Sequence, residues 1–215
     1  MADFRWYGHN GFRIRTKAGT VITDPPEKST GYALTSRPSA DIVTISNDNT
    51  EHKNLKSIKD EYALIDGPGE YEIHDIFVYG VRSYHDDQKG AEFGYNTIFV
   101  FEVEGMRVAH LGDLGHPLTP DLTDALDNID VLLVPAGGGT GIITPEQAAK
   151  LIETIEPNVV IPMQFRTSRG DTGAAPIEEL ASHLGIDLPE PVEKISLRST
   201  DFDDTMSFMV MSPAT

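Results

Sequence analysis

The first half of the chain alternates apolar and polar residues at the spacing of β-strands. Residues 4–7 and 12–15 alternate on either side of a His9-Asn10-Gly11 turn, which predicts a hairpin of two half-buried strands. Residues 62–65 and 69–73 flank a tight Asp-Gly-Pro-Gly turn and are predicted to form a strand, turn and strand. Further strands are expected at residues 20–23, 42–45, 76–81, 84–87, 96–103 and 106–111, and the one at 84–87 ends in a polar cluster.

From residue 117 onward the pattern changes to alternating strands and helices. Pro120 and Pro145 each follow a threonine, the arrangement of an N-cap and a first helical residue, and predict helices over 120–126 and from 145 through Ile155. A third helix is expected over 177–184. Buried strands are predicted at 131–135 and 158–162, with a late pair at 193–198 and 206–211. We expect an α/β protein in which two packed sheets carry helices on their outer faces, forming one domain over residues 1–215.

Composition narrows the function classes. The 215 residues include no cysteine, which excludes disulfides, a Cys-ligated metal and a cysteine nucleophile. The formal net charge of −17 opposes binding to nucleic acid, and no run of eighteen apolar residues predicts a membrane span. The N-terminus lacks the features of a signal peptide, so a cytoplasmic protein is expected. Its expected partner is a small-molecule substrate or ligand, and a homo-oligomer remains open.

Four predicted strands end in side chains that can bind a metal or move a proton. The segment 46–52 follows the strand at 42–45, and His85, Asp113 and Gln164 end three others. One such ending is usually a turn, but the carboxyl ends of several strands can face the same crevice. We therefore predict a shared site.

The chain also resembles a known family. Seven segments in the same order, the most specific being His-Leu-Gly-Asp at 110–113, are similar to the metallo-β-lactamase-fold hydrolases. Within them, the branch containing L-ascorbate-6-phosphate lactonase and many "Zn-dependent hydrolase" proteins is the most similar. The resemblance implies a four-layer αβ/βα sandwich with a metal site between the loops of the two sheets. The segments are residues 7–12, 21–25, 41–43, 67–71, 109–115, 131–135 and 157–165.

The resemblance also implies a set of ligand positions, and several are substituted here. The family motif His-x-His-x-Asp-His falls on residues 47–52, where asparagine replaces both leading histidines and glutamate replaces the aspartate. The later histidine and the bridging aspartate are retained, whereas glutamine replaces the final histidine. The implied metal-site residues are Asn47, Asn49, Glu51, His52, His85, Asp113 and Gln164.

These substitutions leave an oxygen-rich set with two imidazoles, which suits Mn²⁺, Mg²⁺ or Ca²⁺, or a weakly bound Zn²⁺, better than a dinuclear zinc centre. Three alternatives follow. In the first, a hydrolase with one divalent metal acts on a small ester, lactone or phosphoester, with Asp113 and His52 as ligands and Glu51 activating water. In the second, the protein is a catalytically silent member of the fold that keeps the pocket to bind a small molecule or acts as an assembly subunit. In the third, a metal-free hydrolase uses a His85–Asp113 pair.

Three further residues are weaker candidates. His9, in the first hairpin turn, matches a family position near the pocket but can equally be structural. Arg166 and Arg169 follow Gln164 and are the cations that an anionic substrate would meet at that strand end.

Overall fold

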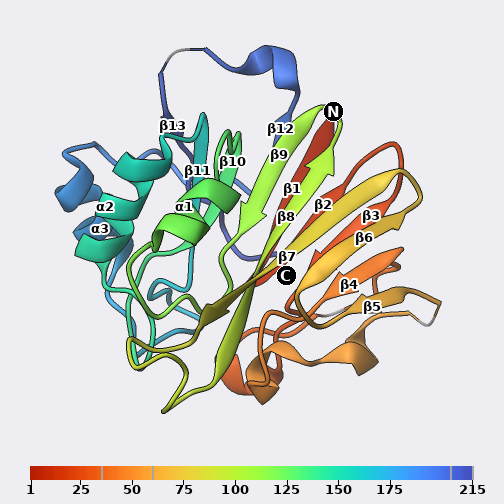
Figure 1. The fold of residues 1–215 in the computed structure, drawn as a ribbon, viewed down its shortest axis with the longest axis horizontal. Helices are drawn as coiled ribbons and strands as arrows, with labels where there is room; N and C mark the ends of the chain where they lie inside the picture. Colours follow the sequence, from red (N-terminus) through yellow and green to blue (C-terminus); the bar gives the residue numbers. More distant parts are fainter. Residues whose placement is uncertain (35, 60, 204, 215) are drawn as a thin grey trace.

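The structure, a computed structural model that describes residues 1–34, 36–59, 61–203 and 205–214, contains two mixed β-sheets packed against each other (Figure 1). The first sheet has the order β12-β1-β2-β3-β4-β5 and the second β13-β11-β10-β9-β8-β7-β6. The strands of the first sheet are β1 (Ala2–Gly8), β2 (Gly11–Arg15), β3 (Thr20–Thr23), β4 (Ile42–Thr44), β5 (Ala63–Ile65) and β12 (Ile195–Leu197). Those of the second are β6 (Gly69–Ile73), β7 (Ile76–Tyr84), β8 (Tyr95–Val103), β9 (Met106–His110), β10 (Val131–Pro135), β11 (Val159–Met163) and β13 (Ser207–Phe208).

Three α-helices lie together beside β10 and β11 (Figure 1). They are α1 (Pro120–Ala125), α2 (Pro145–Ile155) and α3 (Ile177–Leu184). Thr144 caps α2 in a reciprocal capping box with Gln147, which satisfies backbone donors at the start of the helix. Short 3₁₀ helices occur at η1 (Lys28–Thr30), η2 (Thr50–His52), η3 (Leu55–Ser57) and η4 (Ser199–Asp201). Within the described residues, no helix is both long enough and apolar enough to cross a membrane.

The alternation of the strands divides their apolar side chains between two clusters. Phe4 and Trp6 of β1 are fully buried in the main core between the sheets. On β3, Val21 faces the same core, whereas the adjacent Ile22 belongs to a smaller cluster with Val43. The first sheet is therefore apolar on both faces near β3 and β4, and the smaller cluster is completed by residues such as Ile58, which follows η3.

The sequence predicted the α/β sandwich correctly, and the structure shows which strands pair. β5 and β6 do not pair with each other, because β5 pairs in parallel with β4 and β6 pairs antiparallel with β7 in the other sheet. The late strands are also separated, since β12 lies antiparallel to β1 and β13 lies parallel to β11. Turn chemistry identifies where the chain reverses, but the open sheet edge that each strand meets decides its partner.

One end of the sandwich collects the loops that carry the predicted site residues. The turn between β1 and β2 meets the segments that follow β3, β4, β9 and β11 there. Residues 46 and 47 link the two sheets at this end, because Thr97 N donates to Ser46 O at 2.7 Å and Asn47 forms an isolated bridge with Asn96 of β8. The link fixes the segment after β4 against the second sheet.

Candidate metal centre

Asp113 lies at the centre of this end of the sandwich, three residues after His110, the last residue of β9. The preceding Gly112 has a φ of +57°, and a Cβ there would lie 2.5 Å from Asn96 Oδ1 and 2.6 Å from Ser46 Cβ. Asp113 N donates to Asn96 Oδ1 at 2.9 Å. Because only glycine fits at this approach, the backbone of Asp113 is held in one position between the sheets.

Three amide side chains donate to the Asp113 carboxylate. Asn10 Nδ2 lies 2.7 Å and Gln164 Nε2 2.6 Å from Oδ1, and Asn47 Nδ2 lies 3.0 Å from Oδ2. The opposite ends of two of these amides, Asn10 Oδ1 and Gln164 Oε1, are buried and have no hydrogen-bond partner. Buried acceptors without a donor are costly, so these oxygens suit a site that receives a further donor or a cation.

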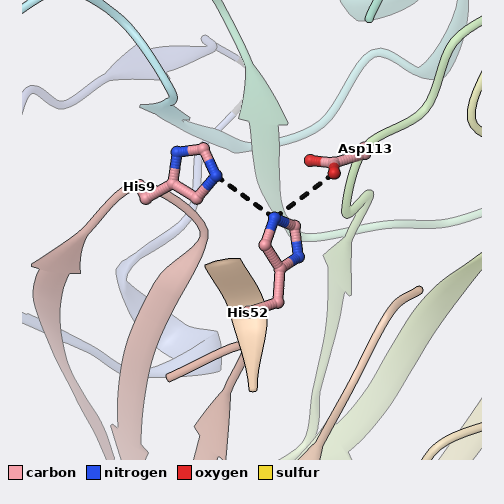
Figure 2. A group of neighbouring side chains, drawn as sticks. All are labelled: His9, His52 and Asp113. Atoms are coloured by element: carbon pink, nitrogen blue, oxygen red, sulfur yellow. Dashed lines mark hydrogen bonds and ion pairs between the residues drawn. The ribbon is translucent and has the colours of Figure 1, made fainter. Parts of the chain in front are cut away.

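Two histidines complete a compact cluster with Asp113, shown in Figure 2. His52 Nε2 lies 3.2 Å from His9 Nε2 and 3.3 Å from Asp113 Oδ2. The ligand atoms of the three residues lie within 4.8 Å of one another, and all three residues are buried. A tetrahedral metal bound at about 2.0–2.1 Å has ligand atoms roughly 3.3–3.4 Å apart. The spacing of these groups therefore fits one divalent ion.

The opposite side of the His52 ring faces a second buried carboxylate. His52 Nδ1 lies 3.4 Å from Asp24 Oδ2, which also accepts a hydrogen bond from Ser46 Oγ at 2.7 Å. Burial alone would lower the pKa of His52, but the carboxylates of Asp113 and Asp24 outweigh it and raise the pKa to about 9. Without a metal, His52 is thus a cation held between two anions.

The pKa values of the neighbouring groups follow from the same arrangement. Burial would raise the pKa of Asp113, but the surrounding histidines, His52 foremost, hold it well below its usual range. His85 Nε2 lies 3.5 Å from Asp113 Oδ2, yet burial lowers the pKa of His85. His85 is accordingly a neutral imidazole at neutral pH, able to act as a ligand.

His9 is oriented from both its side chain and its backbone. Its Nδ1 lies 2.7 Å from Asp171 Oδ1, in the segment that follows β11. Because a carboxylate can only accept, Nδ1 carries the proton and the Nε2 lone pair faces His52. The His9 carbonyl accepts a hydrogen bond from Trp6 Nε1 at 2.9 Å. The turn histidine is therefore held in a geometry suited to binding a metal.

Three residues of this cluster adopt backbone conformations with positive φ, which is uncommon for residues other than glycine. They are His9 at +51°, Asp24 at +35° and Gln164 at +52°. Each directs its side chain from the end of a strand into the cluster. Such conformations concentrate at functional sites, where the surrounding structure maintains them.

A cavity of about 470 Å³ opens beside the cluster. His9, Glu51 and Gln164 line it on the side of the cluster. The rest of its wall is mostly small or polar, with Arg169 and Asp171 as the charged residues of the segment after β11. A small polar molecule could therefore reach the cluster through this cavity.

Most of the residues predicted from the sequence converge on Asp113. Asn47, His52, His85 and Gln164 all contact its carboxylate. Glu51 Oε2 lies 4.0 Å from His9 Nε2, and the Glu51 side chain is 42% exposed. Glu51 therefore lies at the boundary between the cluster and the cavity.

Asn49, in contrast, is used to cap a helix. Its Oδ1 accepts a hydrogen bond from Glu51 N and caps η2. Asn47 uses its own Oδ1 to accept from Asn49 N, so the oxygens of both amides are already engaged by the backbone. Neither amide oxygen is therefore free to bind a metal, and the remaining residues fit one ion rather than two.

The sequence prediction gave too little weight to His9 and overlooked Asn10, Asp24 and Asp171. Asn10 and His9 occupy a hairpin turn, and Asp24 precedes two prolines, so local chemistry explained each without a site. The sequence nevertheless carried a signal for these residues. The segments that contain them follow β1 and β3, just as the predicted site residues follow other strands. Asp171 offered no local signal, since it meets His9 across 162 positions of the chain.

Two mixed sheets with a histidine and carboxylate cluster at one end are characteristic of the metallo-β-lactamase fold. Residues 3–164 match the family profile described as "Beta-lactamase superfamily domain". The chain therefore belongs to the β-lactamase superfamily, as the sequence resemblance predicted. Its assignment to the lactonase branch remains a prediction.

Individual relatives support the same family. A Thermotoga maritima protein, described as a candidate Zn-dependent hydrolase of the metallo-β-lactamase superfamily, has a structure with a TM-score of 0.80 and 31% identity, covering 98% of each chain. A "UPF0173 protein" of Pyrococcus abyssi is 23% identical over 77% of this chain and 84% of its own. A "UPF0173 metal-dependent hydrolase" of Caldivirga maquilingensis is 23% identical over 78% and 83%, respectively.

Proposed function

We propose that the protein is a hydrolase that uses one divalent metal held by His9, His52 and Asp113. The observation that carries the proposal is the spacing of 3.2 and 3.3 Å that His52 Nε2 makes with the other two ligand atoms, which matches neighbouring ligands of one ion. The names of relatives, such as "metal-dependent hydrolase", agree with it. His85, whose Nε2 lies 3.5 Å from Asp113 Oδ2, is placed to add a fourth ligand.

The donor set favours a metal that accepts mixed nitrogen and oxygen ligands. Two imidazoles, one carboxylate and nearby amide oxygens suit Mn²⁺ or Zn²⁺ better than Ca²⁺, which binds oxygen alone. When bound, such an ion supplies Lewis-acid polarisation of a carbonyl or phosphoryl oxygen and lowers the pKa of water.

The residues around the ion then have separate roles in the proposed reaction. Asp171 orients His9, and Gln164 and Asn47 hold the Asp113 carboxylate by hydrogen bonds. Glu51 lies beside His9 and lines the cavity, where it can accept the proton of the attacking water. Arg169 lines the same cavity and can pair with an anionic part of the substrate.

The cavity supports a small polar substrate. Its walls are formed largely by glycine, serine and threonine, and its volume of about 470 Å³ suits a small ester, lactone or phosphoester. The net charge of −17 supports a small-molecule substrate rather than nucleic acid.

Activity screening with a metal-site variant tests this function. Lactones, phosphoesters and carboxylic esters would be offered to the purified protein with added Mn²⁺ or Zn²⁺. We expect one class to be hydrolysed, with the activity abolished by EDTA and by Asp113→Ala. Turnover that persists in EDTA would contradict the metal-dependent proposal and favour the metal-free His85–Asp113 pair.

A second candidate is a catalytically silent, ligand-binding protein. The observation that favours it is the saturation of Asp113, whose two oxygens are contacted by three amides and two imidazoles without a metal. This candidate predicts that the protein hydrolyses none of these substrate classes, with or without added Mn²⁺ or Zn²⁺. Turnover that Asp113→Ala abolishes would exclude it.

A further inference from the structure

A second polar cavity lies on the outer face of the first sheet, away from the metal centre. It has a volume of about 400 Å³ and is lined by Arg5 and Tyr7 of β1 and by Arg13 and Arg15 of β2. The neighbours Phe4, Trp6, Phe12 and Ile14 point into the core, so alternation places the arginines on the opposite face. The remaining wall includes the hydroxyl residues Thr20, Ser36 and Ser39.

The strand register brings the three guanidinium groups into one patch. Arg5 is the direct cross-strand partner of Arg13, and Arg15 is two residues further along the same face of β2. Like charges placed directly opposite each other in a sheet are destabilising. Arg13 Nε is also buried without a hydrogen-bond partner.

The carboxylates near this patch are committed to other groups. Asp3 is the cross-strand partner of Arg15 on this face, but its side chain accepts a hydrogen bond from Ser196 at 2.7 Å and pairs with Lys194 at 2.9 Å. Asp41, which follows the loop at the rim, accepts from Thr20 N. Within residues 1–34, 36–59, 61–203 and 205–214, none of the three arginines forms an ion pair with a carboxylate.

The lack of an ion pair with a carboxylate among the described residues is informative because the chain is strongly acidic. It contains 34 Asp and Glu against 17 Lys and Arg, so a cation meets carboxylates more readily than other cations. Arg5 and Arg13 nevertheless face each other across the strands of one cavity, and within the described residues neither forms an ion pair with a carboxylate. The cost of this arrangement would be offset by an anion bound between them.

We propose that the cavity formed by Arg5, Arg13 and Arg15 is a binding site for a phosphate-class dianion, either free phosphate or the phosphate of a small phosphoester. The guanidinium group presents a planar pair of donors that matches phosphate oxygens, and the hydroxyls of Tyr7, Ser36 and Ser39 supply further donors. The site is independent of the proposed hydrolase function and of the metal centre.

Titration of the full-length protein with inorganic phosphate, followed by ¹H–¹⁵N NMR at constant ionic strength, tests the site. We expect saturable shifts at the backbone amides of β1, β2 and Thr20. The double variant Arg13→Gln/Arg15→Gln should bind phosphate at least about tenfold more weakly, because each charge-assisted hydrogen bond contributes appreciably. Glycerol phosphate, as a second probe, should bind similarly if the site accepts phosphoesters, whereas binding of phosphate alone would identify free phosphate as the ligand.

Two control variants locate the binding. Arg82→Gln removes an arginine that stacks on Tyr95 in the other sheet and should leave the phosphate affinity unchanged. Arg169→Gln removes the cation of the cavity beside the metal centre and should also leave it unchanged.

Three results would overturn the proposal. Equal shifts with chloride would show general ionic screening, and equal affinity for malonate would remove the assignment to phosphate. Shifts confined to residues 169–174 that disappear in Arg169→Gln would place the anion in the other cavity. Melting temperatures of all variants, measured alongside, confirm that each has folded.

Discussion

Whether His9 can bind a metal through Nε2 depends on which ring nitrogen carries its proton. The Asp171 carboxylate fixes this tautomer. Asp171 Oδ1, 2.7 Å from His9 Nδ1, keeps the proton on Nδ1 and leaves Nε2 free. In Asp171→Asn the amide can donate to Nδ1 instead, which moves the proton to Nε2 and blocks it. We expect metal affinity to fall by about 10- to 100-fold, the usual effect of losing such a partner.

Isothermal titration with Mn²⁺ or Zn²⁺ measures this change, and the ¹⁵N shifts of His9 report its tautomer. Asp187→Asn, at an exposed aspartate, is the matched control and should bind metal as the wild type does. Unchanged metal affinity in Asp171→Asn would contradict the orienting role.

His52 gives the metal site its expected pH dependence. Its pKa, raised to about 9 by Asp113 and Asp24, means that a metal must displace a proton at neutral pH. Affinity should therefore rise by up to about tenfold per pH unit and level off above the raised pKa. Titrations in buffers of different ionisation enthalpy should show about one proton released near pH 7.5. A pH-independent affinity would contradict this account, and His183→Gln, at an exposed position of α3, should leave the slope unchanged.

In the metal-free protein the same pKa shift affects stability. The folded-state pKa of His52 lies above its ordinary value of 6.5, so its stabilising contribution is fully present below pH 6.5 and is lost as the pH rises through about 9. Asp113, whose pKa is depressed, contributes in the opposite sense, with its stabilisation lost as the pH falls below 3.8.

At the scale of elements, the β1–β2 hairpin positions His9 through a single tryptophan. The Trp6 ring stacks on Phe165 with centroids 5.0 Å apart, which joins the hairpin to the end of β11. Its Nε1 holds the His9 carbonyl. Trp6→Phe keeps an aromatic ring but leaves that buried carbonyl without its donor, so we expect a loss of about 1–3 kcal/mol in unfolding free energy and weaker metal binding.

Chemical denaturation and metal titration of the same samples test this prediction. Phe101→Leu, a core truncation on β8, is the control: it should lower stability without changing metal affinity. If Trp6→Phe lost only stability, the hairpin would not be positioning His9.

The elements themselves were largely predictable because their local signals agreed with the fold. Thr144-Pro145 begins α2, and the apolar run at β10 is fully buried, as its composition predicted. Strand pairing was less predictable. The Gly67-Pro68-Gly69 turn resembles a hairpin, yet the chain passes there from one sheet to the other.

The site was partly predictable for the same reason. Asn47, His85, Asp113 and Gln164 follow strands whose ends meet, so local pattern and family resemblance were enough to predict that they lie together. Asp171 could not be found, because its role depends on contact with a hairpin turn at the opposite end of the chain.

At the scale of the whole molecule, the candidate metal centre lies where the two sheets meet. His9 and His52 belong to segments of the first sheet, whereas Asp113 follows β9 of the second. A metal that binds the folded chain but not the unfolded chain stabilises the fold by about 2.7 kcal/mol when its free concentration is 100 times its dissociation constant. For a chain of this size we expect the melting temperature to rise by roughly 5–10 °C. Scanning fluorimetry measures the shift, and His52→Ala should remove it.

The metal stoichiometry tests the central claim most directly. It would be measured by elemental analysis of protein purified without chelator and then equilibrated with Mn²⁺ or Zn²⁺, and an anomalous-scattering map would locate the ion. We predict one equivalent of metal per chain, located between His9, His52 and Asp113 and lost in Asp113→Ala. Two equivalents per chain, or none under any of these conditions, would contradict it.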